Sequence, residues 1–220
     1  MFKTSIKKII ELCHGQTITE LNFEENKCFN LHISVDSRNV LKGDIFVCLK
    51  GDRVDGHDFI EDVLRKTPKV IIVQKNIDVS LFNTTEVVFI KVKNTHDSLI
   101  QLAFEMSFNR NNIVVSGSAG KTTTNQTLNC LLPKAYATFK NYNTPIGIPI
   151  ALSNIPDNTE WIISELSASY RGEIEKTLEC FSDVKAAILT SVGASHTKYF
   201  SSLEEIMRTK AQIFSKIENP

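Results

Sequence analysis

The chain has 220 residues, of which 42% are apolar and 23% are charged, and this composition excludes a disordered or fibrous protein. Basic and acidic residues both number 25, so no net charge favours nucleic acid, and no apolar run is long enough for membrane insertion. The five cysteines form no Cys-x-x-Cys pair and the N-terminus lacks a secretory signal, which together predict a reducing cytoplasm.

The first half of the chain has the pattern of an α/β unit. Helical spacing of apolar residues predicts helices over 2–12, 58–66 and 99–106. Short extended runs predict strands over 28–35, 45–49, 70–73 and 87–92. The polar stretch 76–85 is expected to be a loose loop. A second polar run at 108–112 predicts a boundary between domains at 1–109 and 110–220.

Strands and helices alternate in the second half. The predicted strands cover 113–116, 136–138, 161–165 and 186–190. The predicted helices cover 122–132, 148–154, 173–180 and 203–217. Alternation with short connections favours right-handed crossovers and a mostly parallel sheet, whose ligands bind at the carboxyl ends of the strands. The predicted fold class is therefore α/β in both halves.

The stretch 113–124 indicates a phosphate-binding loop between a buried strand and a helix. Gly117 and Gly120 allow the backbone to turn its N–H groups inward, and the helix that follows directs its positive end at an anion. Lys121 adds a charge for the terminal phosphates of ATP, and Thr122 offers a hydroxyl to Mg²⁺. Because Val115 stands where the usual motif has its first glycine, only a shorter form is present. The simpler alternative is an ordinary turn followed by a solvated lysine.

Five other residues are candidates for chemistry or for binding phosphate, and two of them lie at or after predicted strand ends of the second half. Glu165 closes the strand next to the loop, and its carboxylate would suit Mg²⁺ bound to ATP, although such an acid alone is often a helix cap. His196 follows the next strand and is either a surface histidine or a second metal ligand. Lys210 lies in a predicted helix, where the simplest expectation is an exposed side chain. Arg38 and Arg53 in the first half could bind phosphate through their guanidinium groups.

Several motifs in this order resemble those of the Mur ligases, which build peptidoglycan precursors. The first half resembles their uridine-nucleotide-binding domain through residues 36–38, 43–47 and 50–60. The second half is similar to their central ATPase domain through residues 117–124, 141–149, 165–169, 172–174 and 192–210. The resemblance covers nearly the whole chain.

The resemblance implies an ATP-dependent amide ligase, with roles for residues that match the family motifs. ATP would be bound by the loop residues Gly117, Ser118, Ala119, Gly120, Lys121, Thr122 and Thr123. One Mg²⁺ would be held by Thr122 and Glu165, and His196 would line a second. Lys121, Lys210 and His196 would be catalytic, with Lys210 converted to a carbamate. The substrate would be bound by Ser37, Arg38, Asn143 and Ser167.

Within the family, Asn141-Tyr142-Asn143 and Gly172-Glu173-Ile174 resemble the members that add D-alanyl-D-alanine to a UDP-MurNAc-tripeptide. Members that add diaminopimelate or lysine remain the alternative. By the same resemblance, the chain ends before the remaining strands of the ATPase domain and before the acceptor-binding domain. We therefore expect an N-terminal portion with an incomplete P-loop domain and poor turnover alone, either monomeric or completed by a partner chain.

Two further alternatives come from other functional classes. One is a binding module that holds a uridine nucleotide and retains the ATPase half without catalysis. The other is a general P-loop kinase or ATPase, which would leave Asp36-Ser37-Arg38 without a role.

Overall fold

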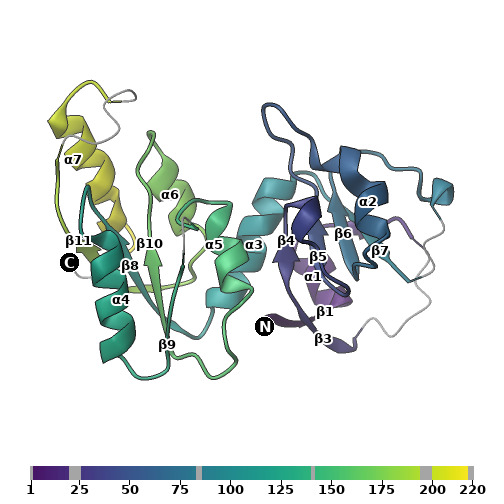
Figure 1. Cartoon of the computed structure of the whole chain (residues 1–220), viewed down its shortest axis with the longest axis horizontal. Helices are drawn as coiled ribbons and strands as arrows, with labels where there is room; N and C mark the ends of the chain where they lie inside the picture. The colour runs from purple at the N-terminus through teal and green to yellow at the C-terminus, as the bar shows by residue number, and fades with distance from the viewer. Residues whose placement is uncertain (1, 20–25, 83–85, 140–141, 194–199, 218–220) are drawn as a thin grey trace. The chain divides into compact units, whose positions relative to one another are not determined.

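The computed structural model describes residues 2–19, 26–82, 86–139, 142–193 and 200–217, and the chain forms two compact units (Figure 1). Unit 1 is Met1–Leu102 and unit 2 is Ala103–Pro220. The division lies inside helix α3, Thr95–Ser107, whereas the polar run in the sequence placed the boundary after residue 109. None of the described helices combines the length and apolar character needed to cross a bilayer.

Unit 1 contains a five-stranded sheet in the order β2-β7-β6-β5-β4. Its strands are β2 Gln16–Thr17, β4 Ile33–Ser34, β5 Ile45–Val47, β6 Val70–Val73 and β7 Val88–Lys91. The pairs from β4 to β7 are parallel, and β2 pairs antiparallel with β7 at the edge. β2 is not among the predicted strands, because two residues are too few to show a periodic pattern.

The N-terminal segment corrects one prediction. The helix expected over 2–12 begins only at Ile6, as α1 Ile6–Leu12. The residues before it form β1 Phe2–Ser5, which pairs antiparallel with β3 Cys28–Leu31. Ser5 ends the strand and caps the helix, since its side chain accepts a hydrogen bond from the Lys8 N–H at 3.2 Å. The strand depends on a partner that is distant in sequence and therefore outside the reach of helical periodicity.

Unit 1 also contains short helical segments between β4 and β7. They are η1 Ser37–Asn39, η2 Gly56–Phe59, α2 Ile60–Leu64 and η3 Val79–Leu81. The helix predicted over 58–66 is thus a 3₁₀ turn followed by one and a half turns of α-helix. The polar stretch 76–82 is not entirely loose, because it contains η3, and Ile77, Val79 and Phe82 pack on the core built around Phe46 and Phe89.

Unit 2 contains a four-stranded, entirely parallel sheet in the order β11-β8-β10-β9. The strands are β8 Asn111–Ser116, β9 Ala135–Ala137, β10 Trp161–Glu165 and β11 Val184–Leu189. The helical segments are α4 Lys121–Leu131, α5 Gly147–Leu152, α6 Glu173–Leu178, α7 Leu203–Ala211 and η4 Gln212–Phe214. Each strand predicted in this half is confirmed, and the helix predicted over 203–217 is divided into α7 and η4.

Alternation of side chains gives the sheet of unit 2 two apolar faces. Ile113, Val115 and Ile163 point to one face and form a buried cluster to which Leu128 of α4 adds its side chain. Figure 1 shows α4 lying along the strands in this half of the chain. Because α4 packs here, its N-terminus is fixed at the carboxyl end of β8.

A polar network around the buried His57 in unit 1 anchors the loop between β5 and α2. Asp55 accepts a hydrogen bond from His57 Nδ1 at 2.5 Å and forms an ion pair with Lys75 Nζ at 2.8 Å. The other ring nitrogen of His57 accepts from the Gln74 N–H at 3.0 Å. The loop is therefore tied to the carboxyl end of β6. Burial opposes ionisation of Asp55, but hydrogen bonds from Lys75 and His57 outweigh burial and hold the pKa of Asp55 well below its usual range.

We predict that Asp55→Asn lowers the free energy of unfolding of unit 1 by about 1.5 kcal/mol at neutral pH, because hydrogen bonds to a charged acceptor are lost. The folded pKa of Asp55 lies below that of the unfolded chain. Its contribution is therefore complete above an aspartate's ordinary pKa of about 3.9 and is lost as the pH falls through that value toward the folded pKa. Urea unfolding followed at neutral and acidic pH measures both effects.

Asp62→Asn is the matched control. Asp62 pairs with Arg65 at 3.2 Å, but both side chains are mostly exposed, so the loss should be below about 0.5 kcal/mol. Equal urea midpoints for the two variants at neutral pH would contradict the prediction.

Candidate nucleotide sites

The register of the parallel strands collects the predicted phosphate-site residues at one edge of the sheet of unit 2. Val115 pairs with Glu165 of β10, and Ser116 pairs with Leu189 of β11. The turn after β8, the carboxylate at the end of β10 and the segment after β11 therefore leave the sheet together. This is the edge at which parallel sheets bind ligands.

Both glycines of the loop are required by its geometry. A Cβ on Gly117 would lie 2.0 Å from Thr190 Oγ1, so no side chain fits there. Gly120 has a φ of 85° and is the residue before α4, a left-handed conformation that glycine adopts without strain. The first N–H groups of α4 have no partners within the helix, and they face the loop from its end. The loop thus has the backbone properties of an anion site.

Two lysine side chains converge on one carbonyl of the loop. Lys121 Nζ donates to Gly117 O at 2.7 Å, and Lys210 Nζ approaches the same oxygen at 3.4 Å. Lys210 is only 2% exposed, so its default interpretation as a surface lysine is wrong. Burial and then the charge of Lys121 lower the pKa of Lys210, and the carboxylate of Glu173 opposes that shift. Two cations next to a single carbonyl favour a polyanionic ligand.

The two predicted oxygen ligands for Mg²⁺ lie next to each other. Thr122 Oγ1 donates to Glu165 Oε2 at 3.2 Å, and Glu165 is 7% exposed. A hydroxyl and a carboxylate beside a phosphate loop fit the preference of Mg²⁺ for a few oxygen ligands together with phosphate. His196, which was predicted to line a second Mg²⁺, lies outside the described residues. Those residues contain no group of three or more histidine, cysteine or acidic side chains suited to a metal.

The predicted substrate residues of unit 2 are also in contact with each other. The Ser167 N–H donates to Asn143 O at 2.8 Å, and the Ser167 and Ser169 hydroxyls are 2.9 Å apart. The Ser169 N–H in turn donates to Glu173 Oε2 at 2.6 Å. Glu173 had no predicted role of its own. Its position in the Gly-Glu-Ile motif was the only signal, and its 2% exposure shows that the carboxylate is buried.

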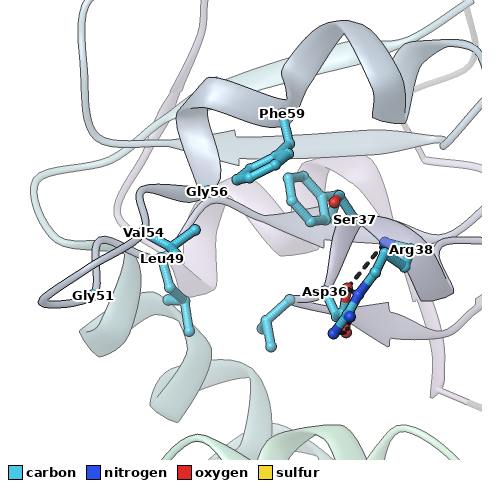
Figure 2. Close-up of a pocket in the computed structure, with 10 residues that line it drawn as sticks. Asp36, Ser37, Arg38, Leu49, Gly51, Val54, Gly56 and Phe59 are labelled. Carbon is cyan, nitrogen blue, oxygen red and sulfur yellow. Dashed lines mark hydrogen bonds and ion pairs between the residues drawn. The ribbon is translucent and has the colours of Figure 1, made fainter.

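Unit 1 has a pocket of about 560 Å³ at the carboxyl ends of β4 and β5. Its lining combines polar residues after β4 with apolar and glycine residues around the next loop: Val35, Asp36, Ser37, Arg38, Phe46, Leu49, Gly51, Val54, Gly56 and Phe59. Figure 2 shows Leu49 and Val54 across the pocket from Asp36 and Arg38. Ser37 and Arg38 were predicted to bind substrate, and both line the pocket. Arg53 is exposed and is not among these lining residues.

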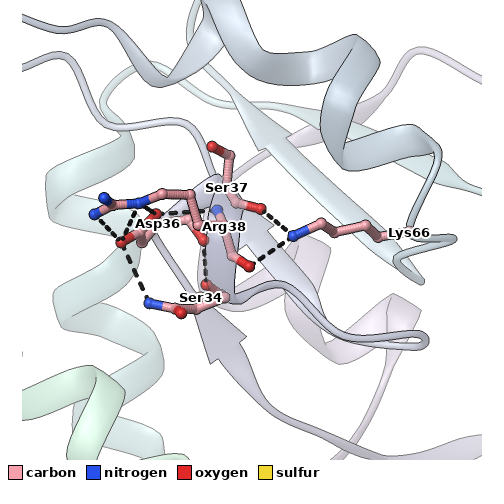
Figure 3. A network of polar contacts seen from close by, with 6 residues as sticks. Ser34, Asp36, Ser37, Arg38 and Lys66 are labelled. Atoms are coloured by element: carbon pink, nitrogen blue, oxygen red, sulfur yellow. Dashed lines mark hydrogen bonds and ion pairs between the residues drawn. The ribbon is translucent and has the colours of Figure 1, made fainter.

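A polar network fixes the residues after β4 (Figure 3). Arg38 donates to Asp36 through Nε at 2.9 Å and through Nη2 at 2.7 Å. The hydrogen bond from Arg38 lowers the pKa of Asp36. Lys66, which sequence analysis did not select, donates from Nζ to Ser37 O at 2.8 Å and to Arg38 O at 2.7 Å. These bonds hold the backbone of the 36–38 turn, and no local pattern around Lys66 indicated them.

Two family models together match most of the chain. The family model "Mur ligase middle domain" matches residues 115–220, and "Mur ligase family, catalytic domain" matches residues 31–105. A UDP-N-acetylmuramoyl-tripeptide–D-alanyl-D-alanine ligase of Rickettsia prowazekii is 33% identical over 83% of this chain and 40% of its own length. The Bacillus subtilis enzyme of the same name is 29% identical over 99% of this chain and 47% of its own length. The chain thus spans less than half the length of these relatives.

Solved structures agree with the sequence matches. A crystal structure of MurF from Acinetobacter baumannii aligns with a TM-score of 0.85 and 27% identity, over 99% of this chain and 47% of that chain. The MurF ligase of Thermotoga maritima, solved in complex with ADP, aligns with a TM-score of 0.74 and 31% identity, over 86% and 44%. Together the two family models and these neighbours show that the chain belongs to the Mur ligase family and carries its N-terminal and middle domains.

Proposed function

We propose that this chain provides the nucleotide-binding part of an ATP-dependent ligase that adds D-alanyl-D-alanine to a UDP-N-acetylmuramoyl-tripeptide. The names of the relatives support the reaction, and the ADP complex of one neighbour supports the nucleotide. The observation that carries the proposal is the approach of Lys121 and Lys210 to the carbonyl of Gly117, beside the Thr122–Glu165 pair. All five cysteines are free thiols, which suits the cytoplasm, where ATP is available.

In the proposed ATP site the β- and γ-phosphates lie against the loop and the first turn of α4. Lys121 would leave the Gly117 carbonyl for phosphate oxygens, since an anionic acceptor makes the stronger hydrogen bond. Thr122 and Glu165 would hold Mg²⁺, which supplies positive charge to the phosphate oxygens when it is bound. Lys121 and Mg²⁺ would then be in position before the reaction begins. Phosphoryl transfer is usually catalysed by positive groups positioned in this way.

The proposed reaction has two steps. A peptide carboxylate oxygen bonds to the γ-phosphorus of ATP and the bond to the β-phosphate oxygen breaks, so that an acyl phosphate and ADP form. The amine of D-alanyl-D-alanine then bonds to the acyl carbon, the carbon–oxygen bond to phosphate breaks, and the amine loses a proton. Lys121 would stay bound to oxygens of the transferred group through both steps.

We also propose that Lys210 becomes a carbamate. The neutral amine attacks the carbon of CO₂, a nitrogen–carbon bond forms and one proton leaves. The lowered pKa of Lys210 increases the neutral fraction that can react, and the remaining N–H can still donate to Gly117 O. The product places an anion in a buried position next to Lys121.

In unit 1 the proposed ligand is the uridine diphosphate end of the precursor. Leu49, Val54 and Phe59 would contact the base and ribose, whereas Arg38 on the opposite side would pair with a phosphate. Asp36 holds the plane of the guanidinium in a fixed direction and so reduces the loss of side-chain entropy on binding.

Lys121→Met should weaken binding of Mg-ATP to the 220-residue chain at least about tenfold, because the charge on the loop is removed while the alkyl stem remains. Isothermal titration calorimetry measures this change. Thr127→Ala, at an exposed position further along α4, should bind as the unchanged chain does. A chain that binds a UDP-sugar but no Mg-ATP would contradict the proposal and favour a binding module.

Arg38→Gln should weaken binding of UDP about tenfold and leave binding of uridine unchanged, because the guanidinium meets a phosphate and not the base. The matched control is Arg65→Gln, since Arg65 is also exposed and paired with an aspartate. Equal affinities of the unchanged chain and Arg38→Gln for UDP would show that Arg38 does not bind phosphate.

A carbamate on Lys210 should give a carbonyl signal in the ¹³C NMR spectrum after addition of ¹³C-bicarbonate. The signal should grow as the pH rises through the lowered pKa of Lys210, because only the neutral amine reacts. It should be absent in Lys210→Arg and present in Lys216→Arg. Lys216 is the matched control because it is partly buried and its Nζ donates to a backbone carbonyl, Phe181 O, at 2.9 Å. A signal that persists in Lys210→Arg would assign it elsewhere.

A further inference from the structure

Two serine hydroxyls join the phosphate loop to the segment after β11 in a reciprocal pattern. Ser191 Oγ donates to Ala119 O at 3.0 Å and accepts from Ala119 N at 2.9 Å. Ser118 Oγ donates to Gly193 O at 3.0 Å and accepts from Gly193 N at 2.9 Å. Each serine therefore binds both backbone groups of one residue on the opposite segment. We call these four residues the clasp.

Further contacts place the clasp close to the turn of the loop. The Ser118 N–H donates to Ser191 O at 3.0 Å. Thr190 Oγ1 lies 2.5 Å from Ala119 O and 3.2 Å from Ser116 O, and its hydroxyl can donate to one of them at a time. The same oxygen occupies the space that a Cβ on Gly117 would need. The loop and the segment after β11 are thus packed together without room for another group between them.

The sheet alone does not require these bonds. β8 and β11 are already paired in register up to Ser116 and Leu189, and the clasp lies beyond the last paired residues. Its effect is on the shape of the loop. The N–H groups of Ser118 and Ala119 are held by Ser191, so the loop turns in one way and presents the N-terminus of α4 at a fixed position. Ordering the loop before binding removes an entropic cost from binding.

We propose that Ser191 and Ser118 are positioning residues that hold the phosphate loop in its binding shape before the nucleotide arrives. The ligand in this inference rests on the proposed function, because the loop is taken to bind Mg-ATP. The clasp itself can be tested without a ligand, since it predicts protection of two particular amides from solvent.

Ser191→Ala should increase the hydrogen-exchange rate of the Ala119 amide in the free chain, and it should weaken Mg-ATP binding about fivefold, because loss of both hydrogen bonds of the Ser191 hydroxyl leaves the free loop less ordered. Ser191→Thr keeps a hydroxyl and should restore both values in large part. Ser118→Ala is a second, independent variant, for which the Gly193 amide should exchange faster. Exchange is followed by NMR and binding by calorimetry.

The matched control is Ser107→Ala. The Ser107 hydroxyl donates to Phe104 O at 2.8 Å and accepts from Ser182 N at 2.8 Å, and it joins the segments that precede β8 and β11. This variant loses a similar pair of bonds at the opposite end of the same strands. It should be destabilised to a similar degree while Ala119 exchange and Mg-ATP affinity stay unchanged.

The outcomes separate the clasp from the proposed function. Unchanged exchange at Ala119 in Ser191→Ala would overturn the clasp, as would an equal loss of Mg-ATP affinity in Ser107→Ala. If the unchanged chain does not bind Mg-ATP, the proposed function fails, and exchange at Ala119 and Gly193 still decides whether the clasp holds the loop.

Discussion

Val115 pairs with Glu165 on one side and with Ile188 on the other, and the proposed phosphate site depends on this register. A slip of one residue in β10 would turn Glu165 to the opposite face of the sheet, away from Thr122. The register is in turn fixed by the apolar side chains of β8 and β10 that pack against α4. Burial of a few apolar residues therefore decides where the carboxylate, the loop and the clasp meet.

The proposed phosphate site carries an electrostatic cost that an anionic ligand would relieve. Lys121 and Lys210 are both directed at the carbonyl of Gly117, which has only a partial negative charge. Their mutual repulsion and the burial of Lys210 disfavour the charged form of that lysine, as its lowered pKa records. Any anion that binds the native chain and neutralises these groups also stabilises the fold. Stability and ligand binding should therefore be coupled in unit 2.

The two proposed sites would bind anions in different ways. The site in unit 2 combines backbone N–H groups at a helix end, Lys121 and a loop that is held by serine hydroxyls. Unit 1 instead has an open pocket with an apolar wall and one exposed arginine, whose direction is set by Asp36. The first arrangement suits the compact, highly charged phosphates of ATP. The second suits a longer ligand that carries both a base and phosphates.

The local sequence determined much of this architecture. Strand, turn and helix follow one another at 113–124 with apolar and glycine residues in the pattern that the structure confirms. The same holds for the order of strands and helices through unit 2, because hydrophobic periodicity and turn residues act over a few positions. The N-terminal exception, β1, arose where a strand partner far along the chain overrode helical spacing.

The candidate residues also differ in whether local sequence or only tertiary packing could reveal them. Lys121, Thr122 and Glu165 could be selected as candidates from sequence because each lies at one end of a predicted element: the lysine and the threonine at the start of a helix, and Glu165 at the end of a strand. Burial of Lys210 could not be predicted, since its helix shows an ordinary amphipathic pattern and the lysine becomes buried only when that helix packs. The contacts of Ser191 with Ala119 and of Asp55 with Lys75 could not be predicted from the sequence either. Sequence by itself determined the strand, turn and helix on which the proposed phosphate site is built. Only tertiary packing decided which distant hydroxyls and charges hold them, because those contacts join residues that no local pattern relates.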